Sequence, residues 1–181
     1  MKNKRSSREF MAWACVALWV FLIYATLYIV RPICEFLKDS TPFTILINTL
    51  LILIITGLAF YFYKNIGFQN KKAAGQFFFT VVVYMIALQK MEIPEEKVHL
   101  IEYGLLAFLL HRAVFLRFEG WHIYIISFII AALIGWGDEG IQYLLPNRYY
   151  QFRDVLLNWF GAGMGFLVVG SLKKNHRHLI F

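Results

Sequence analysis

Cysteine and proline are scarce in this sequence, with two and four examples among 181 residues. On one helix, Cys15 and Cys34 would lie about 28 Å apart at 1.5 Å per residue. That separation excludes a disulfide between them, and neither cysteine stands in a metal-ligand spacing. The sequence therefore predicts neither a disulfide scaffold nor a cysteine-bound metal.

Charged residues are also few, at 16%, whereas 60% of the residues are hydrophobic and 18% are aromatic. A soluble domain of this size has too little interior to hide so much apolar surface from water, but lipid can solvate it. The net charge of +7 does not indicate nucleic acid, because Lys and Arg fall in the short gaps between apolar runs. We therefore expect the lipid bilayer, and no nucleic acid, as a partner.

The apolar runs indicate an all-α fold, a polytopic transmembrane helical bundle of about six helices. A bilayer core requires roughly 20 residues of helix, which the first two runs supply; the fourth is the weakest, so four or five spans remain alternatives. The fifth run either turns at Gly137–Gly140 or continues as helix towards Leu145. The predicted spans are residues 11–30, 43–63, 73–88, 98–110, 121–136 and 155–172.

The distribution of charge predicts the orientation. With six spans and a cytoplasmic N-terminus, the cytoplasmic segments carry 12 of the 18 Lys and Arg residues, and nine of the eleven acidic residues fall on the other side. Cytoplasmic loops carry an excess of positive charge, so we expect a multi-pass protein with both termini in the cytoplasm. These segments are residues 1–10, 64–72, 111–120 and 173–181, the last a basic tail.

Polar side chains interrupt the apolar pattern in two stretches. In the first, Glu95, His99 and Glu102 are spaced i, i+4 and i+7, so they share one helix face. The predicted topology brings this stretch and the second, residues 138–158, to the same outer surface of the membrane. Ionisable groups at membrane depth are costly and tend to face a bundle interior or a wet cavity, so we expect the two stretches to meet there.

The second stretch contains two pairs of polar residues four positions apart. On a continuous helix Asp138 shares a face with Gln142, and Asp154 shares a face with Asn158. Asp154 is equally suited to cap the N-terminus of the last helix. The sequence leaves both roles open for Asp154.

The order of these polar residues resembles that of the VanZ-like membrane proteins, over roughly residues 75–170. The family shows four short patterns on successive helices, and each is weak alone. Asn147 departs from the family, which usually has Gly at that position. The matching patterns are Lys97-x-His99, Asp138-Glu139-x-x-Gln142, Pro146-x-Arg148 and Asp154-x-x-x-Asn158-x-x-Gly161.

The resemblance implies an integral protein of the bacterial cell membrane. Its namesake is linked to low-level resistance to teicoplanin, a glycopeptide antibiotic that acts on the outer side of that membrane, which agrees with an outward-facing site. The family's molecular activity is not established, so the resemblance supplies no reaction. It does suggest a division into two N-terminal helices (residues 1–72), a VanZ-like four-helix core (73–172) and the tail (173–181).

The polar residues allow three kinds of chemistry. His99, Glu102, Asp138 and Glu139 are candidate catalytic acid–base groups, and the same four are candidate ligands of a divalent metal, the only cofactor the sequence suggests. Arginines bind phosphate through forked hydrogen bonds. The candidate substrate-binding residues are Lys97, Gln142, Arg148, Arg153, Asp154 and Asn158.

Three functions follow from this chemistry. The sequence favours a protein that binds, or acts on, an outer-leaflet phospholipid or a lipid-linked cell-wall precursor. The alternatives are a membrane-embedded enzyme that modifies a lipid head group, and a small transporter or structural membrane partner. Transport has less support, because no inverted repeat is visible.

Several of these residues also have plainer interpretations. Gly161 and Gly165 form a G-x-x-x-G pair, which favours close helix packing. His99 and Glu102 form a purely structural pair in one alternative. His111 and Arg112 are expected to be flanking residues that extend to the inner surface.

Overall fold

Six α-helices make up the fold in the computed structural model, which describes residues 2–40, 43–91, 94–145 and 149–172. Each helix is long and apolar enough to cross a membrane, so the predicted all-α bundle with about six spans is confirmed. The helices are α1 Lys2–Ser40, α2 Phe43–Asn65, α3 Lys71–Lys90, α4 Pro94–Phe115, α5 His122–Leu144 and α6 Phe152–Ser171.

The helix boundaries follow local sequence signals. α3 begins after Asn70, whose Oδ1 accepts a hydrogen bond from the Ala73 N–H at 3.2 Å, a typical N-cap. α4 begins at Pro94, and proline suits a first helical turn because that turn needs no donor. Gly67 and Gly120 adopt positive φ angles in the connections before α3 and α5, where other residues would be strained.

The end of α5 and the start of α6 decide two questions that the sequence left open. α5 continues through Gly137 and Gly140 to Leu144, so Asp138 and Glu139 lie on helix rather than in a turn. The expectation that Asp154 caps α6 is wrong, because α6 starts about a turn before the predicted span and Gln151 is its N-cap. Asp154 lies instead in the first turn of α6, where a negative charge favours the helix dipole.

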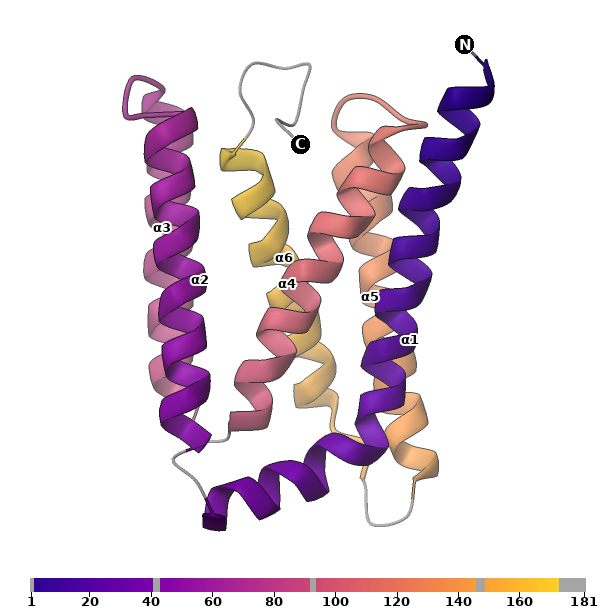
Figure 1. Cartoon of the computed structure of the whole chain (residues 1–181), viewed down its shortest axis with the longest axis vertical. Coiled ribbons are helices and arrows are strands. Elements are labelled where there is room, and N and C mark those ends of the chain that lie inside the picture. The colour runs from indigo at the N-terminus through magenta and orange to yellow at the C-terminus, as the bar shows by residue number, and fades with distance from the viewer. Residues whose placement is uncertain (1, 41–42, 92–93, 146–148, 173–181) are drawn as a thin grey trace.

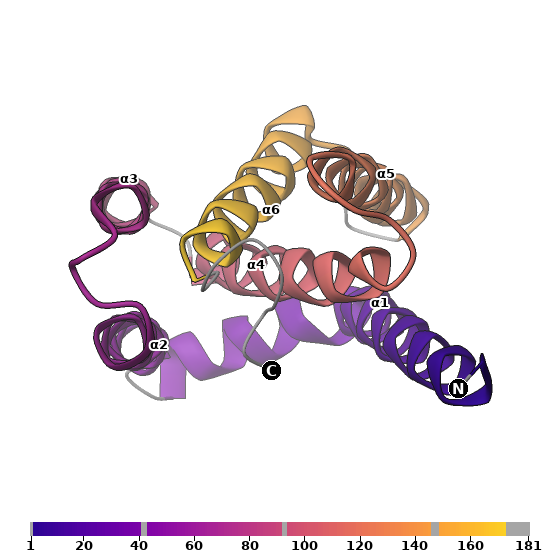
Figure 2. The same ribbon diagram turned by 90° about the horizontal axis from the view of Figure 1, so that it is seen from above.

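α4 is the central helix of the bundle and contacts α1, α2, α5 and α6. In Figure 2, α2 and α3 form a pair to one side, and α1, α5 and α6 surround α4. The largest buried apolar cluster draws on α1, α4, α5 and α6, whereas α3 packs on α6 and shares the Phe62–Phe77 ring stack with α2. The division of the chain at residue 72 stays a prediction, and α1 is part of the bundle around the polar residues.

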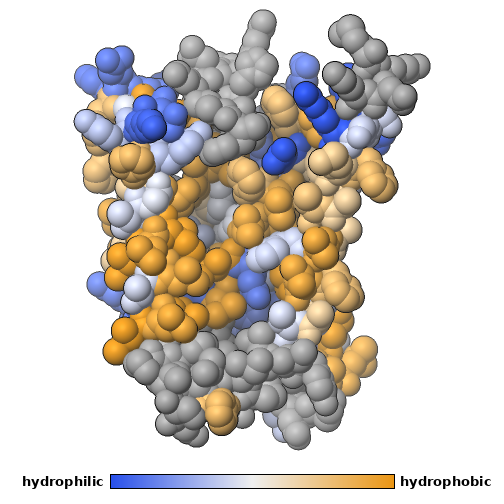
Figure 3. All heavy atoms as spheres, viewed as in Figure 1, coloured by the Kyte–Doolittle hydropathy of each residue, from blue (hydrophilic) through white to orange (hydrophobic). Residues whose placement is uncertain are grey.

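The two ends of the bundle differ in character. Figure 1 shows the α2–α3 and α4–α5 connections and the start of α1 at its upper end, while the α5–α6 connection lies at the lower end. The last part of α1, beyond the candidate span Arg5–Leu27, turns across that lower end. Figure 3, in the same view as Figure 1, shows apolar residues over the middle of the molecule and hydrophilic residues gathered at its top. A membrane-spanning protein requires such a distribution.

His111 departs from the expectation of a flanking residue. Its side chain is fully buried, and its ring lies 5.2 Å from that of Tyr124. The expectation fails because α4 is central, so even its last turns are enclosed by α5. Arg112, the next residue, is exposed.

Glycines allow α4 and α6 to approach closely. A Cβ on Gly165 would lie 2.8 Å from the Ala107 Cβ and 2.8 Å from the Gly104 carbonyl oxygen, and one on Gly161 would lie 3.3 Å from the Leu100 Cα. Small residues at helix interfaces serve this purpose in membranes. The close-packing interpretation of the G-x-x-x-G pair is therefore confirmed.

We expect Gly165→Ala to destabilise the bundle, because the added methyl group must push α4 and α6 apart. Overpacking of this kind typically costs roughly 1–3 kcal/mol, which a thermal unfolding measurement in detergent would detect. Gly163→Ala is the control, since its Cβ would meet Phe128 Cε2 at an ordinary 3.8 Å. Equal unfolding temperatures for the two variants would contradict the proposed constraint.

Candidate functional site

Three helices bring polar side chains together near the lower end of the bundle. α4 supplies His99, Glu102 and Tyr103, α5 supplies Asp138, and α6 supplies Asn158; these five residues are called the Asp138 network below. For these five residues, the predicted contact between the two polar stretches is present.

Asp138 is the centre of the network. Its Oδ2 accepts a hydrogen bond from the Tyr103 hydroxyl at 3.2 Å and another from Asn158 Nδ2 at 3.2 Å. All three side chains are fully buried. A buried carboxyl group is costly unless it is paired or hydrogen bonded, so these two donors are needed to hold Asp138 inside the bundle.

A glycine makes this approach possible. A Cβ on Gly135 would lie 2.9 Å from the Asn158 Cβ and 3.2 Å from Tyr103 Cε1. Asn158 also donates to the Gly135 carbonyl oxygen at 3.4 Å. The absence of a side chain at this position therefore brings both donors within reach of Asp138.

His99 and Glu102 form the more accessible side of the network. His99 Nδ1 lies 3.3 Å from Glu102 Oε2 and 4.0 Å from Asp138 Oδ2, and the two side chains are 18% and 17% exposed. The predicted pair is present, but it is not isolated, because His99 also lies beside Asp138. One imidazole between two carboxyl groups is suited to proton exchange and to hydrogen bonding of a ligand.

Glu139 lies outside this network. Gln142 Nε2 donates to its Oε1 at 2.8 Å, and the Gln151 backbone N–H donates to its Oε2 at 3.1 Å. Gln142 shares a face of α5 with Asp138, as expected for a continuous helix, and it donates a hydrogen bond to Glu139. The first bond lies within α5, and the second joins α5 to Gln151, the N-cap of α6. Glu139 therefore has a structural role beside its predicted acid–base role.

The predicted cations lie around the network rather than in it. Lys97 is buried and donates to Asn48 Oδ1 at 3.0 Å, which links α4 to α2. Arg153 pairs with Glu96 at 3.1 Å, and its own side chain is 65% exposed. Glu96 is buried, so the pair is not easily broken, but the exposed part of the Arg153 guanidinium can still meet a second anion.

The structure shows no hydrogen bond or ion pair with the Asp138 network for the remaining predicted site residues that it describes. Asp154 is half-buried in the first turn of α6. Arg148 lies outside the described residues, as does the side chain of Glu95. Within the part of the chain that the structure describes, no group of three or more His, Cys, Asp or Glu side chains is arranged to hold a metal ion.

Three residues that support the site were not identified from the sequence. Tyr103 stands four residues after His99, so helical periodicity was a usable signal for it. Trp19 Nε1 donates to the Glu102 carbonyl oxygen at 3.0 Å, and the Tyr24 hydroxyl donates to the Ile134 carbonyl oxygen at 2.8 Å. No sequence signal pointed to these two α1 residues, because only the tertiary packing brings them beside α4 and α5.

Two buried oxygens of the site can accept further hydrogen bonds. Among the described residues, Asp138 Oδ1 and Asn158 Oδ1 have no hydrogen-bond partner. Buried polar atoms are normally hydrogen bonded. Both oxygens are acceptors, so they favour a group that carries O–H or N–H donors.

Comparison with known proteins gives one family. The family model described as VanZ/LLP1 matches residues 10–173. The match includes α1 and α2, and so extends well beyond residues 75–170, over which the resemblance was drawn. Neither the curated proteins nor the solved structures contain a match to the chain.

We expect Tyr103→Phe to destabilise the protein by roughly 1–3 kcal/mol, the usual cost of leaving a buried acceptor without its donor. Thermal unfolding in detergent measures this change. Tyr143→Phe is the matched control, because Tyr143 is 69% exposed on α5. The importance of the Tyr103–Asp138 hydrogen bond would be refuted by identical unfolding of both variants and the unsubstituted protein.

Proposed function

This chain belongs to the VanZ/LLP1 family, and from that premise we propose that it binds the polar head group of a lipid, or of a lipid-linked cell-wall precursor, in the outer leaflet of a bacterial cell membrane. The observation that carries the proposal is the partly exposed His99–Glu102 pair joined to the buried Asp138. The pair offers a ligand an accessible contact, and Asp138 supports that pair from inside the bundle.

The charges of the site favour one orientation of the head group. The network itself is acidic, with Glu102 and Asp138 beside His99. Sugar hydroxyls or an amine therefore suit the exposed side of the His99–Glu102 pair better than a phosphate does. A phosphate suits the edge, where the exposed Arg153 guanidinium offers forked hydrogen bonds.

The proposed side of the membrane rests on the positive charges. The connections at residues 66–70 and 116–121 lie at the end of the bundle opposite the Asp138 network. The basic segments predicted to be cytoplasmic adjoin those connections. A precursor held at the outer surface would be less available to a glycopeptide such as teicoplanin, which is the resistance role that the family resemblance implies.

An enzyme that modifies the head group is the second candidate. His99 stands within 4.0 Å of two carboxyl groups, an arrangement that supports proton transfer to or from a bound group. Asp138 would then position and charge-balance the imidazole. Proton transfer is therefore a second use of the arrangement that carries the binding proposal.

We expect a thiol-labelling experiment to place the Asp138 network on the outside. In a background with Cys15→Ser and Cys34→Ser, Tyr149→Cys should react with a membrane-impermeant maleimide in intact cells. Glu119→Cys, at the other end, should react only after permeabilisation, because both side chains are exposed but on opposite sides. The reverse pattern would overturn the proposed orientation.

We expect His99→Ala to lose a lipid or lipid-linked precursor that co-purifies with the unsubstituted protein, as measured by mass spectrometry of the bound lipids. His122→Ala is the control, since His122 is an exposed histidine at the opposite end of α5. A species kept by His99→Ala but chemically altered only by the unsubstituted protein would favour the enzyme. Identical lipid profiles for all three proteins would refute a role of His99 in binding.

A further inference from the structure

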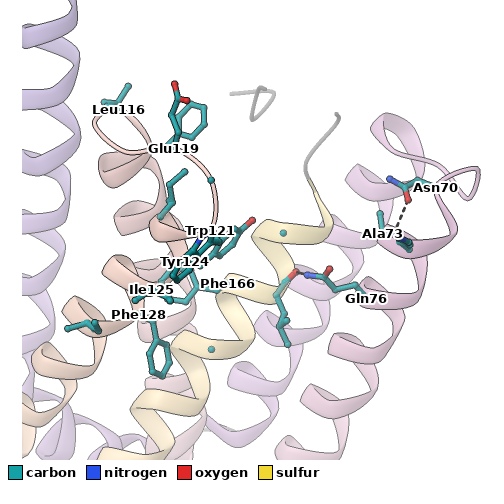
Figure 4. Close-up of a pocket in the computed structure, with 18 residues that line it drawn as sticks. Asn70, Ala73, Gln76, Leu116, Glu119, Trp121, Tyr124, Ile125, Phe128 and Phe166 are labelled. Carbon is teal, nitrogen blue, oxygen red and sulfur yellow. Dashed lines mark hydrogen bonds between the residues drawn. The ribbon is translucent and has the colours of Figure 1, made fainter. Parts of the chain in front are cut away.

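A large groove lies at the upper end of the bundle, far from the Asp138 network. It is formed between α3 and α5 over the surface of α6, has a volume of about 1660 Å³, and shares no residue with the network. Figure 4 shows Gln76 on one side of it and Tyr124, Phe128 and Phe166 on the other. The name α3–α5 groove is used for it below.

The walls of the α3–α5 groove suit hydrocarbon. They include the aromatic rings of Phe128 and Phe166 and the aliphatic side chains of Ile125 and Leu167. These residues belong to helical segments that are long and apolar enough to span a bilayer. Lipid is therefore the solvent on this side of the bundle, and acyl chains are the apolar matter available to fill the groove.

A hydrogen bond and two glycines shape the floor of the groove. Gln76 Nε2 on α3 donates to the Leu167 carbonyl oxygen on α6 at 2.7 Å. A Cβ on Gly170 would lie 2.7 Å from that nitrogen, and Gly163 adds a second position without a side chain. α3 is thus fixed against α6, while the floor of the groove carries little bulk.

Among the described residues that line the α3–α5 groove, one carries a positive charge and one a negative charge. Lys72 at the start of α3 and Glu119 in the α4–α5 connection both line it, and both are exposed. A phosphate would be attracted to the lysine and an ammonium group to the glutamate. An anionic head group without an amine would meet Glu119 unfavourably.

We propose that the α3–α5 groove binds one glycerophospholipid with an amine-bearing, zwitterionic head group. The phosphate lies by Lys72, the ammonium group lies by Glu119, and an acyl chain runs along Phe128 and Leu167. The volume exceeds the roughly 300–1,000 Å³ of small-molecule pockets, and it suits a lipid better than a small metabolite. This site is independent of the outer-leaflet ligand proposed above.

The first test fills the groove. Gly163→Leu places a side chain on its floor, whereas Gly57→Leu places the same side chain in open space on α2. Each protein is reconstituted in nanodiscs with equal amounts of phosphatidylethanolamine and phosphatidylglycerol, and retained lipid is then measured by native mass spectrometry. Gly163→Leu should lose tightly held phosphatidylethanolamine, and Gly57→Leu should keep it. Equal retention by Gly163→Leu and Gly57→Leu would overturn the proposal.

The second test addresses the head group. The unsubstituted protein should prefer phosphatidylethanolamine, and Glu119→Gln should reduce this preference roughly fivefold, the factor given by about 1 kcal/mol per charge near a membrane surface. Glu9→Gln is the control, since that carboxylate lies at the same end but pairs with Arg117 and does not line the groove. Preference for phosphatidylglycerol, or no effect of Glu119→Gln, would overturn the assignment of the head group.

Discussion

The arrangement of the helices around the site depends on one buried carboxyl group. Asp138 on α5 takes a hydrogen bond from Tyr103 on α4 and another from Asn158 on α6. Lipid offers no replacement donors, so the three helices must stay in register for Asp138 to remain satisfied. Hydrophobic burial cannot supply that specificity in a bilayer, where the surroundings are as apolar as the core.

The site and the groove illustrate two ways to shape a helical bundle. At the Asp138 network, Gly135 lets polar side chains converge, and the result is a compact acidic centre. At the α3–α5 groove, Gly170 lets the Gln76 amide approach α6 and reach the Leu167 carbonyl oxygen, while Gly163 leaves the floor without a side chain. Glycine therefore allows close polar contact in both places, and at Gly163 it also keeps the groove floor low.

The sequence predicted the number of spans and most of the residues that meet at the site. Hydropathy located the helices, and the spacing of His99 and Glu102 on one face anticipated their contact. The capping role of Asp154 was wrong because it depended on where α6 begins, which hydropathy does not fix. The burial of His111 and the part played by Trp19 were beyond prediction, since both depend on which neighbour covers α4.

α1 is attached to α4 and α5 beside the site through main-chain groups and not through site side chains. Trp19 and Tyr24 donate to the main-chain carbonyl oxygens of Glu102 and Ile134, groups that every amino acid possesses. Substitution at position 102 leaves that anchor unchanged, because the acceptor does not depend on the side chain carried there. The frame can accordingly tolerate a different side chain at position 102 while α1 stays attached.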